Sequence, residues 1–243
     1  MTPRIYTDQA LATGISISLP PVAARHIQVL RLQPGSSIAL FNSMGDIEGE
    51  FAAVVQSMGR SDVTVMVGDF KPTQLEAIRA VHLAIGMPAN ERMDWLVEKA
   101  TELGVASIQP LMTERTVLRL GGERAEKKRA HWQGIAIAAC EQCGRNRVPL
   151  VHAPASLSDW LKTLASSTDA RLLLSLQAAS QPLLKAMGAS LSMTFLSGPE
   201  GGLSPLEESA ALAKGFAAVT LGPRVLRSET APLAVLASLT ILA

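Results

Sequence analysis

The chain has 243 residues, with 22 Lys and Arg against 21 Asp and Glu, and its formal net charge is +1. Hydrophobic residues make up 48% of the sequence and charged residues 18%, which excludes a disordered or strongly basic chain and allows one large domain or two small ones. Any contact with nucleic acid must therefore depend on local clusters of charge.

Targeting segments and metal ligands are not indicated by the sequence. The first residues lack the apolar run of a secretory signal, and the apolar stretch at residues 232–243 is too short to span a bilayer. We therefore expect a cytoplasmic protein without a membrane partner, in which this stretch is a buried helix. Cys140 and Cys143 lack the further ligands that a zinc site needs, so we expect no metal and two free thiols.

Residues 1–72 are predicted to form a small β domain. Turn-forming Gly, Pro, Asn and Asp separate short runs of strand-forming residues, namely SISL, SIALFN, GEFAAVVQSM and DVTVMVGDF. Several short strands in this length are typical of a small barrel. A short helix, PVAARHIQVLRLQ, interrupts them and is expected to end at Pro34 and Gly35.

Residues 73–243 show a different pattern, in which apolar strand candidates alternate with helices. The strand candidates are RAVHLAIGM, VASIQPLM, ARLLLSL, SMTFLSG and FAAVTLG. The helix NERMDWLVEKATELG places Met93, Leu96, Val97, Ala100 and Leu103 on one face and is stopped by Gly104. A second, long helix is predicted for ERAEKKRAHWQGIAIAACEQCG. This alternation predicts an α/β domain with a mainly parallel sheet.

A glycine-rich turn, GPEGG at residues 198–202, joins a predicted strand to a predicted helix. Ser204, Pro205 and Glu207 fit the N-cap, first and third positions of that helix, which is the pattern of a capping box. Ligands of open α/β sheets bind beyond the carboxyl ends of the strands. Neither nucleotide-binding glycine motif is present, and Glu200 would repel a phosphate. From these residues alone, a structural turn and a ligand-binding loop are equally good interpretations.

A second strand-end loop, GPRVLRSETAP at residues 222–232, carries Arg224, Arg227 and Glu229. One interpretation is a surface loop with solvated charges or a weak Arg–Glu pair. The other is that this loop and the GPEGG turn form two walls of one pocket, since both follow apolar strands and precede helices.

A basic stretch runs from Arg115 to Arg147. It contains eight Lys or Arg (Arg115, Arg119, Arg124, Lys127, Lys128, Arg129, Arg145 and Arg147) against three Glu (Glu123, Glu126 and Glu141). Such clusters can neutralise nucleic-acid phosphates, although residues 123–129 could equally form a solvated helix face. The GRNR segment at residues 144–147 follows a helix in a loop, which favours a binding role more strongly.

Four ordered motifs resemble those of the RsmE family, the bacterial small-subunit (16S) ribosomal RNA uridine-N3 methyltransferases of the SPOUT class. They are EKATELGV (98–105), ACEQCGRNRVP (139–149), SGPEGGLS (197–204) and LGPRVLRSETA (221–231), and the resemblance runs from RIY at residues 4–6 to the C-terminus. It implies an N-terminal PUA-like β-barrel that recognises RNA and a C-terminal SPOUT domain with a deep trefoil knot. It also implies a homodimer, with S-adenosyl-L-methionine as the cofactor and ribosomal RNA of the 30S particle as the partner.

The resemblance also implies roles for individual residues. The cofactor would be bound by Leu174, Ser175, Leu176, Gly198, Pro199, Glu200, Gly201, Gly202, Leu221, Gly222, Arg224, Leu226 and Arg227. In the catalytic step Arg227 would stabilise the uracil anion. Glu229 or Glu200 would orient the Arg227 guanidinium or accept the N3 proton. RNA would be bound by Arg145, Arg147, Arg4, Arg25 and Arg31.

Two other functions are compatible with these residues. A related SPOUT enzyme could methylate a ribose 2′-hydroxyl or another base, because the cofactor pocket would be similar. A non-catalytic RNA-binding assembly factor could keep the same fold without binding the cofactor.

Overall fold

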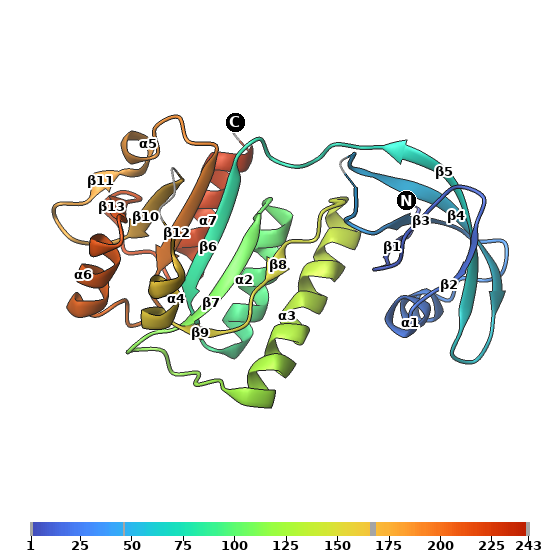
Figure 1. Cartoon of the computed structure of the whole chain (residues 1–243), viewed down its shortest axis with the longest axis horizontal. Helices are drawn as coiled ribbons and strands as arrows, with labels where there is room; N and C mark the ends of the chain where they lie inside the picture. The colour runs from blue at the N-terminus through green and yellow to red at the C-terminus, as the bar shows by residue number, and fades with distance from the viewer. Residues whose placement is uncertain (1, 46, 166–168, 242–243) are drawn as a thin grey trace. The chain divides into compact units, whose positions relative to one another are not determined.

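The computed structural model describes residues 2–45, 47–165 and 169–241 (Figure 1). The chain forms two compact units. The first comprises Met1–Glu76 and Ile137–Val148, and the second comprises Ala77–Ala136 and Pro149–Ala243. The first unit thus includes a segment that lies far along the sequence from the expected boundary at residue 72, and no local pattern indicates this.

The first unit contains a five-stranded sheet in the order β1-β3-β4-β5-β2. Its strands are β1 (Arg4–Tyr6), β2 (Ser16–Ser18), β3 (Ser37–Phe41), β4 (Gly49–Met58) and β5 (Val63–Pro72). β1 pairs with β3 in parallel, and the other pairings are antiparallel. All four predicted strands are confirmed, whereas the three-residue β1 is too short for its sequence to indicate it.

Helix α1 (Pro21–Val29) packs against this sheet through Ala23, Ala24 and Ile27. The alternation of DVTVMV is confirmed, because Val63, Val65 and Val67 are fully buried in the same core. The helix ends at Val29, before the expected stop at Pro34, and Arg31 adopts a positive φ of 56°. A left-handed residue ends a helix as a glycine would.

The second unit contains an eight-stranded sheet in the order β11-β13-β10-β12-β6-β7-β8, with β9 paired to β7. Its strands are β6 (Ala80–Gly86), β7 (Ser107–Met112), β8 (Leu150–Val151), β9 (Ala155–Ser156), β10 (Ala170–Leu174), β11 (Gln181–Pro182), β12 (Ser192–Ser197) and β13 (Ala217–Thr220). Every pairing within the described residues of this sheet is parallel. The predicted α/β fold with a mainly parallel sheet is therefore confirmed.

The helices that follow α1 are α2 (Asn90–Glu102), α3 (Gly122–Cys143), α4 (Leu157–Thr163), α5 (Leu183–Ala186), α6 (Pro205–Ala213) and α7 (Thr230–Leu236), followed by a π-helix, Ala237–Ile241. Four of the five residues of the predicted apolar face of α2 (Met93, Leu96, Val97 and Ala100) are fully buried, whereas Leu103 is half-buried at the C-cap. Gly104 has a positive φ of 85° just after the helix. The short helices α4 and α5 are not indicated by the sequence analysis.

Helices α4 and α6 pack on one face of the parallel sheet, and Leu157 and Leu161 of α4 share a core with Leu173 and Leu196 of the strands. Helices α2 and α7 contact each other, and α7 also contacts β12. Of the described part of the apolar C-terminal stretch, Leu233, Val235, Leu236 and Leu239 are buried within this unit, whereas Ile241 is exposed. Thr240 donates a hydrogen bond to the Leu103 carbonyl (2.6 Å). Among the described helices, none has the length and apolarity needed to cross a membrane.

Candidate functional site

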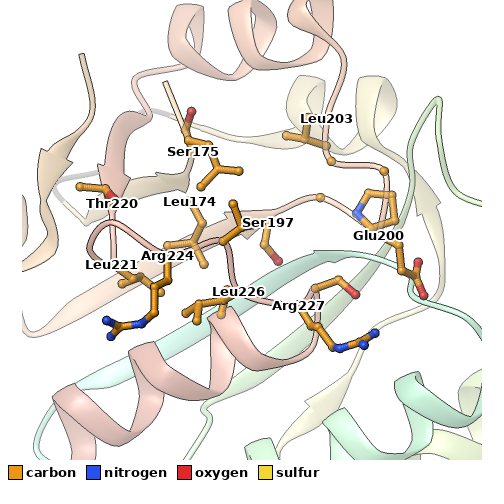
Figure 2. A pocket seen from close by; sticks show the side chains of 18 of the residues that line it. Leu174, Ser175, Ser197, Glu200, Leu203, Thr220, Leu221, Arg224, Leu226 and Arg227 are labelled. Carbon is orange, nitrogen blue, oxygen red and sulfur yellow. The ribbon is translucent and has the colours of Figure 1, made fainter. Parts of the chain in front are cut away.

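A pocket of about 600 Å³ lies where three adjacent strands of the parallel sheet end (Figure 2). β10 pairs with β12 on one side and with β13 on the other, so the carboxyl ends of all three strands meet at one edge. The segments that follow them line the pocket. This is the position at which open α/β sheets bind ligands, and the volume is in the usual range of about 300–1,000 Å³ for ligand sites.

All thirteen residues predicted to bind a cofactor line this pocket. They are Leu174 at the end of β10, with Ser175 and Leu176 after it; Gly198, Pro199, Glu200, Gly201 and Gly202 after β12; and Leu221, Gly222, Arg224, Leu226 and Arg227 after β13. The hypothesis that the two Gly-Pro loops form walls of one pocket is therefore confirmed as geometry.

The turn after β12 is packed so tightly that two positions require glycine. A Cβ on Gly198 would lie 2.6 Å from the carbonyl carbon of Gly202 and the backbone nitrogen of Leu203. A Cβ on Gly86 of β6 would lie 2.5 Å from the Pro199 ring. These contacts fix the path of the turn over the end of β6.

The predicted capping box of α6 is confirmed. Ser204 accepts a hydrogen bond from the Glu207 amide, and Glu207 accepts one from the Ser204 amide (2.9 Å). The same carboxylate also accepts a hydrogen bond from the amide of Glu114 (2.7 Å), in the segment after β7. The helix that follows the turn is therefore fixed both locally and by a distant segment.

Glu200 is directed toward the N-terminus of α2. One carboxylate oxygen accepts hydrogen bonds from the Ala89 amide (3.0 Å) and from Nη1 of Arg92 (3.1 Å). Burial raises the pKa of Glu200, but these hydrogen bonds and the charge of Arg92 outweigh it and leave the pKa below its usual value. Glu200 is therefore held as a carboxylate, which weakens it as a general base.

Two arginines that the sequence analysis did not place in the site also line the pocket. Arg92 comes from the first turn of α2, and Arg115 comes from the segment after β7. Arg115 donates a hydrogen bond to the Gly201 carbonyl (2.7 Å) and lies against that glycine. Arg115 could have been suspected from the basic stretch, whereas nothing near Arg92 in the sequence marks it.

The charged residues of the segment after β13 differ in whether they line the pocket and in whether they are paired. Figure 2 shows Arg224 and Arg227 extending in opposite directions, and Arg227 makes no ion pair with any described residue. Glu229 is 8% exposed and does not line the pocket. It accepts a hydrogen bond from Ser228 Oγ (3.0 Å), and its other oxygen is 3.9 Å from Nε of Arg92. Of the three predicted catalytic residues, Arg227 is thus the one that lines the pocket without an ion-pair partner among the described residues.

The pocket combines apolar walls with polar groups. Leucines 174, 176, 203, 221 and 226 contribute apolar surface. Glu208 adds a carboxylate, to which the Ser175 hydroxyl donates a hydrogen bond (3.4 Å). The Ser197 hydroxyl is buried at the pocket and has no hydrogen-bond partner within the described residues. An uncompensated buried hydroxyl is costly, so a ligand that bonds to it would be favoured.

Of the five predicted RNA-binding arginines, Arg145 is buried and Arg4 is largely buried in the first unit. Arg145 is 5% exposed, and its Nε donates to both oxygens of Glu76 (3.0 and 3.1 Å). Burial opposes the charge of Arg145, but its bonds to Glu76 outweigh this and raise its pKa. Arg4 is paired with Glu50 and donates to the Arg145 carbonyl (2.9 Å). Both guanidinium groups are thus paired with carboxylates of their own unit, and their contact with RNA stays a prediction.

The other three predicted RNA-binding residues, Arg25, Arg31 and Arg147, are exposed. Arg147 keeps 54% of its side chain accessible although its Nε is 2.7 Å from Glu48. In residues 123–129, Lys127 pairs with Glu123 and Arg129 with Glu126, as in a solvated helix face.

Both cysteines are free thiols, as expected. Burial raises the pKa of Cys140 to about 12, so it stays protonated at neutral pH and is unreactive. Within the described residues, no group of three or more His, Cys, Asp or Glu side chains could hold a metal ion.

Comparisons with known proteins agree with this fold. Residues 75–240 match the family model of an RNA methyltransferase domain. Ribosomal RNA small subunit methyltransferase E from Buchnera aphidicola is 30% identical over 240 residues, which covers 98% of this chain and 96% of the relative. The protein of the same name from Synechocystis is 32% identical over 231 residues, which covers 93% of this chain and 73% of the relative.

Two solved structures are similar over almost their whole length. Ribosomal RNA small subunit methyltransferase E from Neisseria gonorrhoeae, described as bound to S-adenosyl methionine, is 37% identical, with a TM-score of 0.92 and coverage of 100% of this chain and 98% of that one. A putative methyltransferase from Legionella pneumophila, described as a complex with the same cofactor, is 35% identical, with a TM-score of 0.90 and coverage of 98% of each chain. The chain belongs to the ribosomal RNA small subunit methyltransferase E family of RNA methyltransferases.

Proposed function

We propose that the protein transfers a methyl group from S-adenosyl-L-methionine to N3 of a uridine in small-subunit ribosomal RNA. The observation that carries the proposal is the pocket at the ends of β10, β12 and β13, which is lined by the two family motifs around residues 197–204 and 221–231. The relatives named above are ribosomal RNA methyltransferases, and two similar structures hold this cofactor.

The residues of the pocket fit this cofactor. Its apolar leucine walls suit an adenine ring, and tight glycine turns let backbone groups approach closely. The cofactor has no phosphate and carries positive charge, so the carboxylates of Glu200 and Glu208 are compatible with it. Ser197 Oγ, buried and without a partner among the described residues, is a further group that would bond to it. When bound, S-adenosyl-L-methionine supplies an electrophilic methyl group on a sulfonium sulfur.

Arg227 is the residue to which we assign direct contact with the uracil. The N3 proton of uracil must leave before or during methylation, so negative charge develops on the ring. A guanidinium that has no carboxylate partner within the described structure can stabilise that charge. Glu200 is a poor base because its pKa is lowered, and Glu229 lies outside the pocket lining. We therefore assign both carboxylates to holding Arg92 in place, with the N3 proton passing to water.

The larger architecture belongs to the same proposal. We assign residues 1–72 to a PUA-like barrel that recognises RNA, and residues 73–243 to a SPOUT domain with a deep trefoil knot that works as a homodimer. In the sheet β10 lies between β12 and β13, so the chain crosses β10 between these two strands. This strand order is compatible with such a knot. Exposed Arg25, Arg31 and Arg147 are our candidates for contacts with the RNA backbone. The substrate would be ribosomal RNA of the 30S particle in the cytoplasm.

The test is mass spectrometry of ribosomal RNA nucleosides from cells with and without the gene. Loss of 3-methyluridine from small-subunit RNA on deletion, and its return with the intact gene, is the expected result. A loss of 2′-O-methylated nucleosides or of another methylated base would replace uridine N3 with a different target. Purified protein that shows no binding of S-adenosyl-L-methionine by calorimetry would instead favour an assembly factor.

Replacing Arg227 with Gln is expected to lower kcat by about 10²–10³-fold, because one charged donor to the developing anion is removed. The Kd for S-adenosyl-L-methionine, measured by calorimetry, should change by less than about threefold, since other groups line most of the pocket. Lys162→Gln is the matched control, because it removes an exposed charge from α4, away from the pocket. An unchanged kcat for Arg227→Gln would remove Arg227 from the chemical step.

A further inference from the structure

We infer that Arg92 is a positioning residue, which joins the two loops of the pocket by bridging Glu200 and Glu229. This inference rests on the proposed function, because its effect is expected on cofactor binding. Arg92 lies in the first turn of α2 and lines the pocket.

The first half of the bridge holds the loop after β12. Nη1 of Arg92 and the amide of Ala89 both donate to the same oxygen of Glu200, at 3.1 and 3.0 Å. Ala89 is the N-cap residue of α2, and its own side chain makes no capping hydrogen bond. The Glu200 carboxylate therefore satisfies a free amide of α2, and its charge is favourable at the positive end of the helix.

The second half of the bridge holds the loop after β13. Nε of Arg92 is 3.9 Å from Glu229, whose side chain is 11% exposed. A buried carboxylate is costly without a nearby positive charge. In the part of the chain that the structure describes, Arg92 is the basic side chain paired with Glu229.

The two loops are not neighbours in the sheet, because β10 lies between β12 and β13. Local hydrogen bonds within either loop therefore do not set the distance between them. One guanidinium that contacts a carboxylate from each loop does set this distance. Because the planar group has several donors in a fixed arrangement, it can contact two carboxylates at once, which a lysine ammonium on a flexible chain does less well.

The effect should appear in ligand affinity more than in stability. The side chain of Arg92 is 41% exposed, and that of Glu200 is 35% exposed. Ion pairs of such exposure stabilise the folded state little. Loosening both loops, however, would add the cost of ordering them to each binding event, and this lowers affinity. Arg227 differs in that its guanidinium has no carboxylate partner in the described residues and so is available to the substrate.

The experiment measures the Kd for S-adenosyl-L-methionine by calorimetry, together with KM and kcat on ribosomal RNA. Arg92→Gln should raise Kd and the KM for the cofactor about tenfold, while kcat at saturating cofactor stays within about twofold of wild type. Arg92→Lys should restore part of the affinity, to about threefold weaker than wild type. Lys99→Gln is the matched control, because Lys99 is an ion-paired cation of the same helix that does not line the pocket.

A double-mutant cycle tests the bridge itself. If Arg92 acts through Glu200, the variant that combines Arg92→Gln with Glu200→Gln should bind no more weakly than Arg92→Gln alone. The inference would be overturned by any of three results. These are losses of cofactor affinity that add in the double variant, a wild-type Kd for Arg92→Gln, or a loss of affinity for Lys99→Gln equal to that for Arg92→Gln. Should Arg92→Gln fail to fold, Arg92→Lys and Glu200→Gln still give the same comparison. Wild-type protein that does not bind the cofactor would overturn the proposed function first, which distinguishes the two failures.

Discussion

Gly198→Ala is expected to abolish detectable binding of S-adenosyl-L-methionine. The new Cβ would lie 2.6 Å from backbone atoms of Gly202 and Leu203, closer than any non-bonded carbon contact allows. Backbone atoms cannot turn aside as a flexible side chain does, so the 198–202 turn must open and the pocket wall must move. Overpacking of this kind also destabilises a fold by about 1–3 kcal/mol. Calorimetry for binding and thermal unfolding for stability would measure the two effects.

Two matched glycine variants separate this effect from a general loss of glycine. A Cβ on Gly134, inside α3, would meet nothing within 4 Å, so Gly134→Ala should bind the cofactor normally and be equally or more stable. A Cβ on Gly201 would meet mainly the side chain of Arg115, at 3.1–3.2 Å, which can shift. Gly201→Ala should therefore weaken binding less than Gly198→Ala. Normal binding by Gly198→Ala would show that the turn can move without disturbing the site.

Arg145→Ala is expected to destabilise the first unit by about 3–5 kcal/mol, because it leaves the largely buried carboxylate of Glu76 without its partner. The same substitution is expected to loosen the segment after α3, where Asn146 accepts a hydrogen bond from Arg4 (2.9 Å). Urea unfolding of the purified protein would measure the loss.

The matched control is Arg147→Ala, two residues along the chain. Arg147 pairs with Glu48, but 54% of its side chain is exposed, so its removal should cost less than about 1 kcal/mol. A variant in which Arg145 and Glu76 are both replaced by Met should regain much of the stability, since a buried ion pair can be exchanged for apolar packing. If Arg145→Ala lowered the free energy of unfolding only as little as Arg147→Ala, solvent would be screening the Arg145–Glu76 pair.

The sequence alone predicted most of the pocket. In a parallel sheet the carboxyl ends of the strands share one edge, so the two apolar strands before residues 198–202 and 222–232 already suggested that these loops could meet. The third segment, Leu174–Leu176, was indicated only by the family resemblance. The turn residues were also readable, because Ser204 and Glu207 signal a capping box through contacts only three residues apart. The amphipathic period of α2 predicted its buried face for the same local reason.

Side chains whose partners are distant in the sequence were not predictable. Arg145 and Arg147 belong to one short basic motif. Arg145 is nevertheless buried and paired with Glu76, whereas the side chain of Arg147 is exposed to solvent. The direction of Glu200 depends on the N-terminus of α2, which precedes it by more than a hundred residues. Arg92 has no motif around it and acquires a role only because two carboxylates converge on it.

The sequence by itself therefore determined the order of β-rich and α/β segments, the parallel sheet and two of the loops that line the pocket, because these depend on local periodicity and on chain direction. The tertiary structure alone decided which charges are buried, which arginines face the pocket, and that residues 137–148 belong with the first unit. The physical reason is that the state of a charged side chain depends on its partner and its burial, and both come from residues far away in the chain.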